Sequence, residues 1–253
     1  GRADPAVLWT WGHRADVVAH IALQGLAPRI GSLRSAGAEF VRQRAAWSRL
    51  TDASCARYVS NTELNIAQLD EIIPGVRRKC RVLRNAIERA ALEAEPVALP
   101  EKIDRLEIVM LGNVRIGVKG YDYAVEMMRR LRAEGRPVRL RIAGLPIEAR
   151  ELAALIAAAG VGDAVEFVGP VTDPFPFLRT AHVFLLFSRL EGMPNALLEA
   201  MALGLPCISA RVGDVAAFTQ DRVHLRQIAV GDVASACAAV RDALGNWPEF
   251  RAL

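Results

Sequence analysis

Cysteine and histidine are scarce in this chain of 253 residues, and neither residue type is grouped. The cysteines are Cys55, Cys80, Cys207 and Cys237, with no C-x-x-C pair, and the four histidines are equally scattered. This spacing excludes the common zinc sites, and a chain of this length does not need disulfides to hold its core. We therefore expect four buried or idle thiols in a reducing compartment, and no bound metal.

Aromatic residues, surplus charge and long apolar runs are also few. Only 6% of the residues are aromatic and the formal net charge is +4, which argues against a nucleic-acid groove. The longest weakly charged run, 196–210, still contains Glu199 and is shorter than the roughly 18 apolar residues of a membrane span. Residues 1–5 carry no apolar stretch of a signal peptide. The composition, with 52% hydrophobic residues, predicts a soluble globular protein, and the length predicts two domains.

From residue 106 onward, short apolar strands alternate with helices. The run 183–187 reads VFLLF, without polar alternation, as in a strand buried on both faces. We predict strands at 106–111, 138–143, 165–168, 183–187 and 207–210, and helical segments at 121–134, 147–159, 173–180, 194–203 and 234–244. This order predicts right-handed βαβ units and a parallel sheet, whose ligands bind beyond the carboxyl ends of the strands.

The first hundred residues are less regular. We predict strands at 15–19, 29–33, 57–60 and 82–84, and helices at 36–50 and 63–72. Residues 90–105, with Pro96 and Pro100 among Glu and Ala, are typical of a connector. We therefore expect an N-terminal α/β domain with its connector at 1–100 and a second α/β domain at 101–253.

The segment 188–204, SRLEGMPNALLEAMALG, joins a buried strand to a helix. Pro194 stands where a first helical residue belongs, and such a helix start presents free N–H groups and a positive dipole end to a phosphate. Glu191 lies in the loop and Glu199 in the helix, so the two carboxylates can hold two parts of one ligand, such as hydroxyls of two sugars. The alternative is an ordinary helix with a solvated glutamate.

A second turn of interest follows the strand 106–111 and reads LGNVRIGVKG. Its glycines allow the backbone to approach a ligand, and Arg115 and Lys119 add the positive charge that attracts a diphosphate. The turn is not a P-loop, which would need Lys at 118 and Ser or Thr at 119, and it lacks the G-x-G-x-x-G pattern. A solvated cationic loop is the alternative.

Together these segments resemble the retaining glycosyltransferases of the GT-B fold, family 4 or group 1. Glu191 and Glu199 reproduce the E-x7-E spacing within EGMPNALLEAMALGLPCIS. Further pieces agree in order, namely YVSNTELNIAQL, RVLRNAIE, LGN…KGYDYAVE, RLRIAG, VEFVGPVTD and HVFLLFS. The similarity spans residues 55–245 and is strongest over 106–215. It implies an α/β chain of two Rossmann-like domains, each with a parallel sheet.

The resemblance implies a site for a nucleotide-diphosphate sugar in the second domain. Glu191 would hold hydroxyls of the donor sugar, and Glu199 would hold the ribose of the nucleotide. Lys119 would bind the diphosphate and neutralise the negative charge that develops on it as it leaves the sugar. Val171, beyond the strand 165–168, would lie against the base. The implied donor-binding residues are Gly112, Asn113, Arg115, Lys119, Gly144, Val171, Glu191, Gly192, Met193, Pro194, Asn195, Leu198 and Glu199.

Two positions depart from the family pattern. Many members have Gly-Arg before the lysine, whereas this chain has Asn113 in place of the arginine, and Arg115 matches a variant with arginine two residues later. Ala86 replaces the usual glycine of a hinge-like turn.

The implied reaction is the retaining, metal-independent transfer of a hexose without an enzyme nucleophile. The acceptor hydroxyl attacks from the face that the diphosphate leaves, and a phosphate oxygen takes its proton. In the family a histidine follows a D-[IV]-[VL] strand, and His20, after Asp16-Val17-Val18, is the candidate here; the alternative is a residue at a helix start that faces solvent. Catalysis would then rest on Glu191, Lys119, Arg115 and His20, with no cofactor beyond the donor substrate.

Compared with the family pattern, the N-terminal domain is expected to be partial. Residues 106–253 accommodate a nearly complete donor domain, whereas residues 1–100 hold about half of an acceptor domain. We therefore expect a fragment or a divergent short member that works in the cytoplasm on a sugar, lipid-linked or small-molecule acceptor. The basic residues Arg77, Arg78, Lys79 and Arg81 would allow contact with an anionic inner membrane face, with a solvated charged turn as the alternative.

Two other hypotheses remain open. A decayed or truncated chain would bind nucleotide without transfer, as a binding or scaffold protein; Glu191, Glu199 and Lys119, all present, argue against this. A sugar-nucleotide epimerase on the same architecture would need no acceptor, but the E-x7-E segment favours a transferase.

Overall fold

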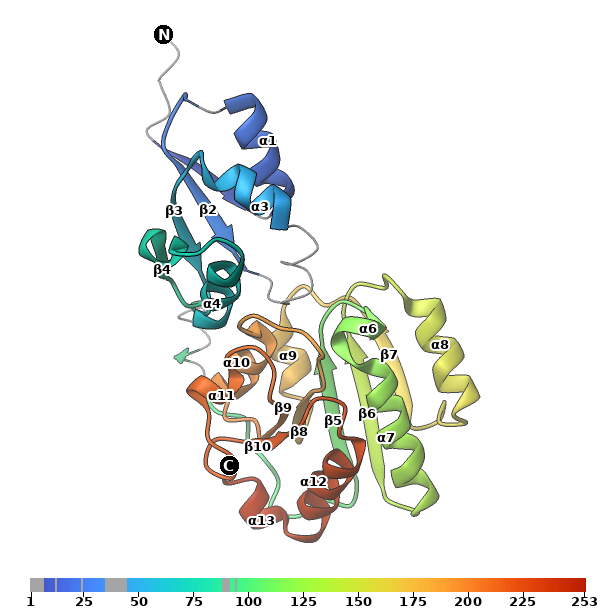
Figure 1. The fold of residues 1–253 in the computed structure, drawn as a ribbon. Coiled ribbons are helices and arrows are strands. Elements are labelled where there is room, and N and C mark those ends of the chain that lie inside the picture. Colours follow the sequence, from blue (N-terminus) through green and yellow to red (C-terminus); the bar gives the residue numbers. More distant parts are fainter. Residues whose placement is uncertain (1–6, 12, 24, 35–44, 88–91, 94) are drawn as a thin grey trace. The chain divides into compact units, whose positions relative to one another are not determined.

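The computed structural model describes residues 7–11, 13–23, 25–34, 45–87, 92–93 and 95–253. By its internal contacts the chain divides into two units, which are described separately (Figure 1). Unit 1 comprises Gly1–Ala86 with Leu190–Met193, and unit 2 comprises Ile87–Arg189 with Pro194–Leu253. Each unit contains one parallel sheet with helical connections, which confirms the predicted α/β class.

Unit 1 is built on a sheet of four parallel strands in the order β1-β2-β3-β4. The strands are β1 (Leu8–Trp11), β2 (Arg29–Leu33), β3 (Cys55–Ser60) and β4 (Cys80–Val82). The described helices are α1 (His13–Leu23), α3 (Ala45–Asp52), α4 (Glu63–Ile72) and the 3-10 helix η1 (Val76–Lys79). A small core lies between α4, η1 and the sheet, formed by Cys55, Tyr58, Ile66, Leu69, Val76 and Cys80.

The strand predicted at 15–19 is wrong, because these residues lie inside helix α1. The neighbouring valines at 17 and 18 favoured a strand. In the structure the buried Asp16 carboxylate pairs with Arg29 of β2 and accepts a hydrogen bond from Thr10 Oγ1 of β1 at 2.5 Å. These contacts fix α1 on the sheet, whose first strand is instead β1. The predicted helix 36–50 is described only from Ala45, and residues 36–44 lie outside the described ranges.

Unit 2 is built on a larger sheet of parallel strands in the order β10-β9-β8-β5-β6-β7. Its strands are β5 (Leu106–Leu111), β6 (Val138–Ala143), β7 (Val165–Gly169), β8 (Val183–Leu186), β9 (Cys207–Ala210) and β10 (Arg226–Ile228). The first five agree with the predicted strands to within one residue, and β10 was not predicted. Strand β5 pairs with β6 on one side and with β8 on the other. The strand order therefore reverses between β5 and β8, and such a reversal is where doubly wound sheets bind ligands.

Helices connect the strands of this sheet. They are α6 (Ile116–Lys119), α7 (Tyr121–Ala133), α8 (Ala149–Ala158), α9 (Pro174–Leu178), α10 (Asn195–Ala202), α11 (Val215–Phe218), α12 (Val233–Gly245) and α13 (Trp247–Phe250). Helix α7 packs against α8 and α12, and α10 packs against α9 (Figure 1). The buried side of α7 includes Val125, Met128 and Leu131, the apolar residues that its 3.6-residue period predicted.

The described part of the connector runs along unit 2. Val97 N–H donates to the Leu203 carbonyl at 2.8 Å, and the indole N–H of Trp247 donates to the Pro100 carbonyl at 2.8 Å. None of the described helices is both long enough and apolar enough to cross a membrane.

All four cysteines are buried free thiols, as predicted. Burial raises the pKa of Cys80 to about 11 and that of Cys207 still further.

Candidate functional site

The two turns singled out in the sequence follow the carboxyl ends of two neighbouring strands. These strands lie where the strand order reverses. Strands β5 and β8 are parallel partners, with Ile108 opposite Val183 and Val109 opposite Phe184. The turn with Lys119 follows β5, and the loop toward α10 follows β8. Because the carboxyl ends of parallel strands lie at one edge of the sheet, both segments begin side by side. Sequence periodicity could not predict this, since it does not reveal which strands pair.

Gly112 and Gly144, from the turns after β5 and β6, are in direct backbone contact. A Cβ on Gly144 would stand only 1.9 Å from the Gly112 carbonyl oxygen. The Gly112 N–H donates to the Ala143 carbonyl at 2.9 Å, and its carbonyl accepts the Tyr121 hydroxyl at 2.7 Å. The two predicted donor-site glycines are thus brought together, with no room for a side chain at position 144.

Helix α6 carries the two predicted cations at its ends. Arg115 is the exposed residue before the helix, in an extended conformation, and its carbonyl accepts the Lys119 N–H at 2.8 Å. Lys119 is half-buried, and its stem lies against Gly112, with Cε 3.3 Å from the position of a Cβ there. Gly120 follows with φ +69°, and a Cβ there would stand 2.1 Å from the Phe187 carbonyl oxygen. The turn is therefore packed directly on the end of β8, while Asn113 is exposed.

An ion pair lies next to this turn. The Asp122 carboxylate, in the first turn of α7, receives two hydrogen bonds from the Arg189 guanidinium at 2.8 and 2.5 Å. Partial burial works against the charged carboxylate, but the hydrogen bonds and positive charge of Arg189 outweigh it and lower the pKa of Asp122. The pKa of Arg189 is raised chiefly by the same hydrogen bonds.

The loop after β8 leads into α10. Ser188 is buried, Glu191 is half-buried, and Gly192 to Pro194 are buried. Helix α10 begins at Asn195, one residue later than predicted, so that Pro194 is the residue before the helix and no side chain caps it there. Leu198 and Glu199 lie half-buried within α10, and Asn195 is exposed. The two glutamates thus stand before and within the helix, as their spacing predicted.

Val171 lies two residues beyond β7, half-buried against the core of unit 2. The next helix, α9, begins three residues later at Pro174, and Asp173 Oδ1, just before it, accepts the Phe175 N–H at 3.0 Å. Val171 therefore belongs to the turns at the carboxyl edge of the sheet, on the side of β6 away from β5.

His20 lies in the last turn of α1, where its Nδ1 is 2.9 Å from Ser54 Oγ. Ser54 directly precedes β3, so this contact is at the amino ends of the strands. The strand that would precede His20 in the family pattern does not exist here. Among the described histidines, His13 stands soonest after a strand, since it begins α1 two residues after the end of β1. Recognition of the short strand LWTW would have drawn attention to His13.

Among the described residues, no three His, Cys, Asp or Glu side chains are grouped so that they could hold a metal ion.

Comparisons with known proteins bear on both the fold and the family. The family model described as "Glycosyl transferases group 1" matches residues 105–246, more than half of the chain. A putative colanic acid biosynthesis glycosyltransferase, WcaL of Escherichia coli K12, is 35% identical over 53% of this chain and 34% of its own length. The lipopolysaccharide core biosynthesis glycosyltransferase LpsE of Rhizobium meliloti is 26% identical over 97% of this chain and 67% of its own.

Among solved structures, Anabaena Alr3699/HepE in complex with UDP-glucose superposes with a TM-score of 0.84. It is 14% identical, and the match covers 97% of this chain and 71% of that chain. At this identity the likeness concerns the fold, which is the GT-B fold. The chain spans about a third of the length of the first of these curated relatives.

Proposed function

The chain belongs to the glycosyl transferases of group 1, and we propose that it moves a hexose from a nucleotide-diphosphate sugar to an acceptor hydroxyl. One observation carries the proposal. The turn with Lys119 and the loop with Glu191 leave the paired strands β5 and β8, at the reversal of the strand order where such sheets bind ligands. In this proposal residues 101–253 bind the donor and residues 1–100 lie on the acceptor side.

In this proposal the carboxylates select the sugars of the donor. Glu191, in the loop, holds hydroxyls of the hexose, and Glu199, eight residues later within α10, holds the ribose hydroxyls. Charged acceptors form the stronger hydrogen bonds to hydroxyl groups, which suits both roles. The backbone N–H groups of Gly192, Met193 and Asn195 face the hexose and the diphosphate, supported by the positive dipole end of α10.

The cations and the glycines serve the diphosphate. Lys119 stabilises the negative charge that develops as the diphosphate leaves, with Arg115 as a second cation. The close approach of Gly112 and Gly144 keeps side chains out of the edge of the sheet next to the phosphates. Asn113, Met193 and Leu198 complete the lining, and Val171 lies toward the base.

The reaction is proposed to be retaining and independent of metal. The acceptor hydroxyl forms its new bond to the anomeric carbon on the face from which the diphosphate departs. A phosphate oxygen of the leaving group takes the proton of that hydroxyl. On the acceptor side we assign no catalytic residue, because His20, the candidate from the family pattern, lies within α1 and contacts Ser54 at the amino ends of the strands.

The names of the similar proteins indicate which substrates to propose. HepE was solved with UDP-glucose, and WcaL and LpsE are named for colanic acid and lipopolysaccharide core biosynthesis. We therefore propose a nucleotide-activated hexose as donor and a growing surface polysaccharide or glycolipid as acceptor, handled in the cytoplasm.

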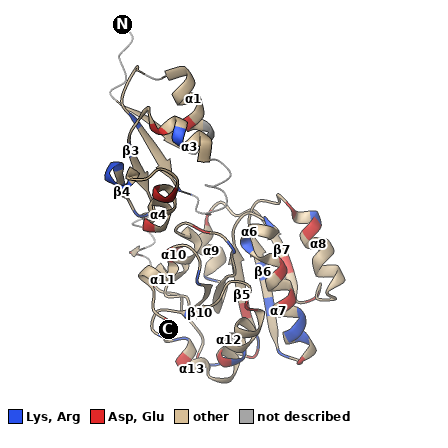
Figure 2. Cartoon of the chain, in the orientation of Figure 1, with Lys and Arg blue, Asp and Glu red and all other residues tan. Residues whose placement is uncertain are grey.

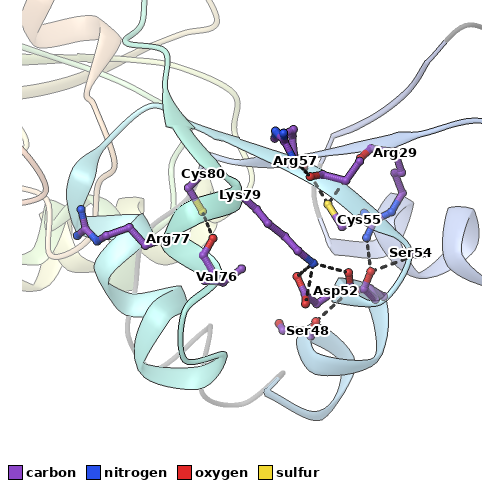
Figure 3. Close-up of polar contacts among 12 residues, drawn as sticks. Arg29, Ser48, Asp52, Ser54, Cys55, Arg57, Val76, Arg77, Lys79 and Cys80 are labelled. Atoms are coloured by element: carbon purple, nitrogen blue, oxygen red, sulfur yellow. Dashed lines mark hydrogen bonds and ion pairs between the residues drawn. The ribbon is translucent and has the colours of Figure 1, made fainter.

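We propose that the basic turn around η1, where Lys and Arg side chains gather in unit 1, contacts the inner membrane face (Figure 2). Figure 3 shows Lys79 turned toward Asp52, with Nζ 3.0 Å from both carboxylate oxygens. Arg77, Arg78 and Arg81 are exposed, so these three side chains would make the contact.

The proposal is tested by following the labelled hexose of UDP-glucose, GDP-mannose and ADP-glucose with the purified chain. One donor is expected to be hydrolysed or transferred with retention, and Lys119→Ala or Glu191→Gln lowers the rate by about 100-fold. Glu151→Gln, on the exposed side of α8, is the matched control. Equal rates in all variants would contradict the assigned roles. Nucleotide binding without any turnover would instead support the binding-protein hypothesis.

A further inference from the structure

Arg189, which none of the proposed roles uses, holds three neighbouring parts of the β5–α7 turn. Its Nη1 donates to the Ile116 carbonyl at 3.0 Å and to Asp122 Oδ1 at 2.8 Å. Its backbone N–H donates to the Val118 carbonyl at 2.8 Å. The guanidinium carbon lies 3.7 Å from the ring centroid of Tyr123, within the range of a cation–π contact.

A carboxylate holds the same turn from the other side. Glu148, in the connection between β6 and α8, accepts the Ile116 N–H through Oε2 at 2.7 Å. Its own backbone N–H donates to the Val114 carbonyl at 2.9 Å. The N–H and the carbonyl of Ile116 are therefore held by two charged side chains from two different loops. Hydrogen bonds with a charged partner are stronger than those between neutral groups.

Helix α6 depends on these outside contacts, because it consists of four residues, Ile116–Lys119. A single helical turn is not stable by itself, since forming the first turn costs more conformational entropy than its hydrogen bonds return. The position of Lys119, the last residue of this turn, is thus decided by the groups that hold Ile116 and Val118. Two of those hydrogen bonds come from Arg189.

We propose that Arg189 is a positioning residue, which holds α6 so that Lys119 reaches the diphosphate of the donor. This inference rests on the proposed function of Lys119. Arg189 also stands two residues before Glu191, so one residue anchors the lysine turn and begins the loop that carries the sugar-binding glutamate. Its planar guanidinium is needed, because it serves Asp122, Ile116 and the Tyr123 face at once.

The kinetic test is a double-mutant cycle on the donor reaction, with Arg189→Met, Arg189→Lys and Lys119→Ala. Arg189→Met is expected to lower kcat by about 10-fold to 100-fold, because a displacement near 1 Å is enough for such a loss. The donor KM is expected to change by less than about threefold. Arg189→Lys restores part of kcat. In the Lys119→Ala background, Arg189→Met causes no further loss, because it acts through the lysine.

Arg139→Met is the matched control, since Arg139 makes an exposed ion pair with Glu166 in the same unit. A purely structural role of Arg189 would produce the same proportional loss with and without Lys119, and this result would overturn the proposal. So would a loss confined to KM.

Hydrogen exchange separates this inference from the proposed function. In Arg189→Met the amides of Val118, Lys119 and Gly120 are expected to exchange at least about tenfold faster, while the Arg139→Met control leaves them unchanged. Unchanged exchange in Arg189→Met overturns the positioning role whatever the activity. If exchange is faster in Arg189→Met but the wild-type chain turns over no donor, the result supports the positioning of α6 by Arg189. The same result contradicts the proposed function.

Discussion

Gly144 lies so close to Gly112 that a Cβ at position 144 would stand 1.9 Å from the Gly112 carbonyl oxygen. The two residues directly follow the neighbouring strands β6 and β5. Their contact lets the backbone itself form the edge of the sheet where the donor diphosphate is proposed to lie. A side chain at position 144 would force these two turns apart.

Gly144→Ala is therefore expected to destabilise unit 2 by about 2 to 4 kcal/mol, as for other substitutions that add atoms without space. Gly117→Ala is the matched control in the neighbouring turn, because a Cβ there meets nothing within 4 Å and the residue is helical. It should be neutral or stabilising by up to about 1 kcal/mol. Urea unfolding measures both values, and equal stability of the two variants would contradict the close contact.

The sequence was sufficient to predict most of unit 2. Strand β8 is a wholly apolar run, as expected of a buried parallel strand, and β5, β6 and β9 each adjoin a glycine or a proline. The E-x7-E segment and the Lys119 turn could be found in the same way, because both follow strands. The pairing of β5 with β8 could not, since tertiary contacts decide strand order.

Unit 1 was predicted less well. The strand β1 has only four residues, and its pattern is too short to distinguish it from a loop. The valines after Asp16 pointed to a strand, but a buried charge pair holds this segment as a helix. Such a pair depends on Arg29, which is distant in sequence, so local propensity could not reveal it.

The buried pair of Asp16 and Arg29 leads to a second prediction. Their side chains are 10% and 2% exposed, and Arg29 also donates to the Thr51 carbonyl. Asp16→Asn would leave the guanidinium charge buried and is expected to lower the free energy of unfolding of unit 1 by about 3 kcal/mol.

The control for this prediction is Glu63→Gln, which breaks the exposed pair with Arg77 and should cost less than about 1 kcal/mol. Three of the four tryptophans lie at positions 9, 11 and 47, so tryptophan fluorescence in urea mainly follows unit 1. If Asp16→Asn lowers the free energy of unfolding no more than Glu63→Gln does, the role of the buried pair is refuted.

A third prediction concerns the dependence of stability on pH. Arg189 lowers the pKa of Asp122 below its ordinary value of 3.8, so the pair stabilises the fold above that pH. The contribution is lost only as the pH falls through the lowered pKa of the folded state. The difference in unfolding free energy between the wild type and Asp122→Asn should be constant from about pH 7 to pH 5 and shrink below about pH 4. A difference that disappears already between pH 7 and pH 5 would contradict the lowered pKa of Asp122, and no difference at any pH would show that the pair does not stabilise the fold.

A fourth prediction concerns the thiols. Burial raises the pKa of all four cysteines, and only the thiolate reacts with alkylating reagents. Iodoacetamide at about pH 8 is expected to leave the folded chain unmodified and to label all four thiols in urea. Mass spectrometry counts the labels. Rapid labelling of Cys207 in the folded chain would contradict its burial.

The central claim is that unit 2 binds the nucleotide of a sugar donor through the helix that carries Glu199. Calorimetric titration of the chain with UDP, GDP and ADP tests it most directly, with Glu199→Ala as the variant and Glu151→Ala as the exposed control. One nucleotide is expected to bind, and loss of a charged hydrogen bond to the ribose should weaken binding in Glu199→Ala by about 10-fold to 100-fold. Absence of binding by all three nucleotides to the folded chain, or equal binding by Glu199→Ala, would contradict the account.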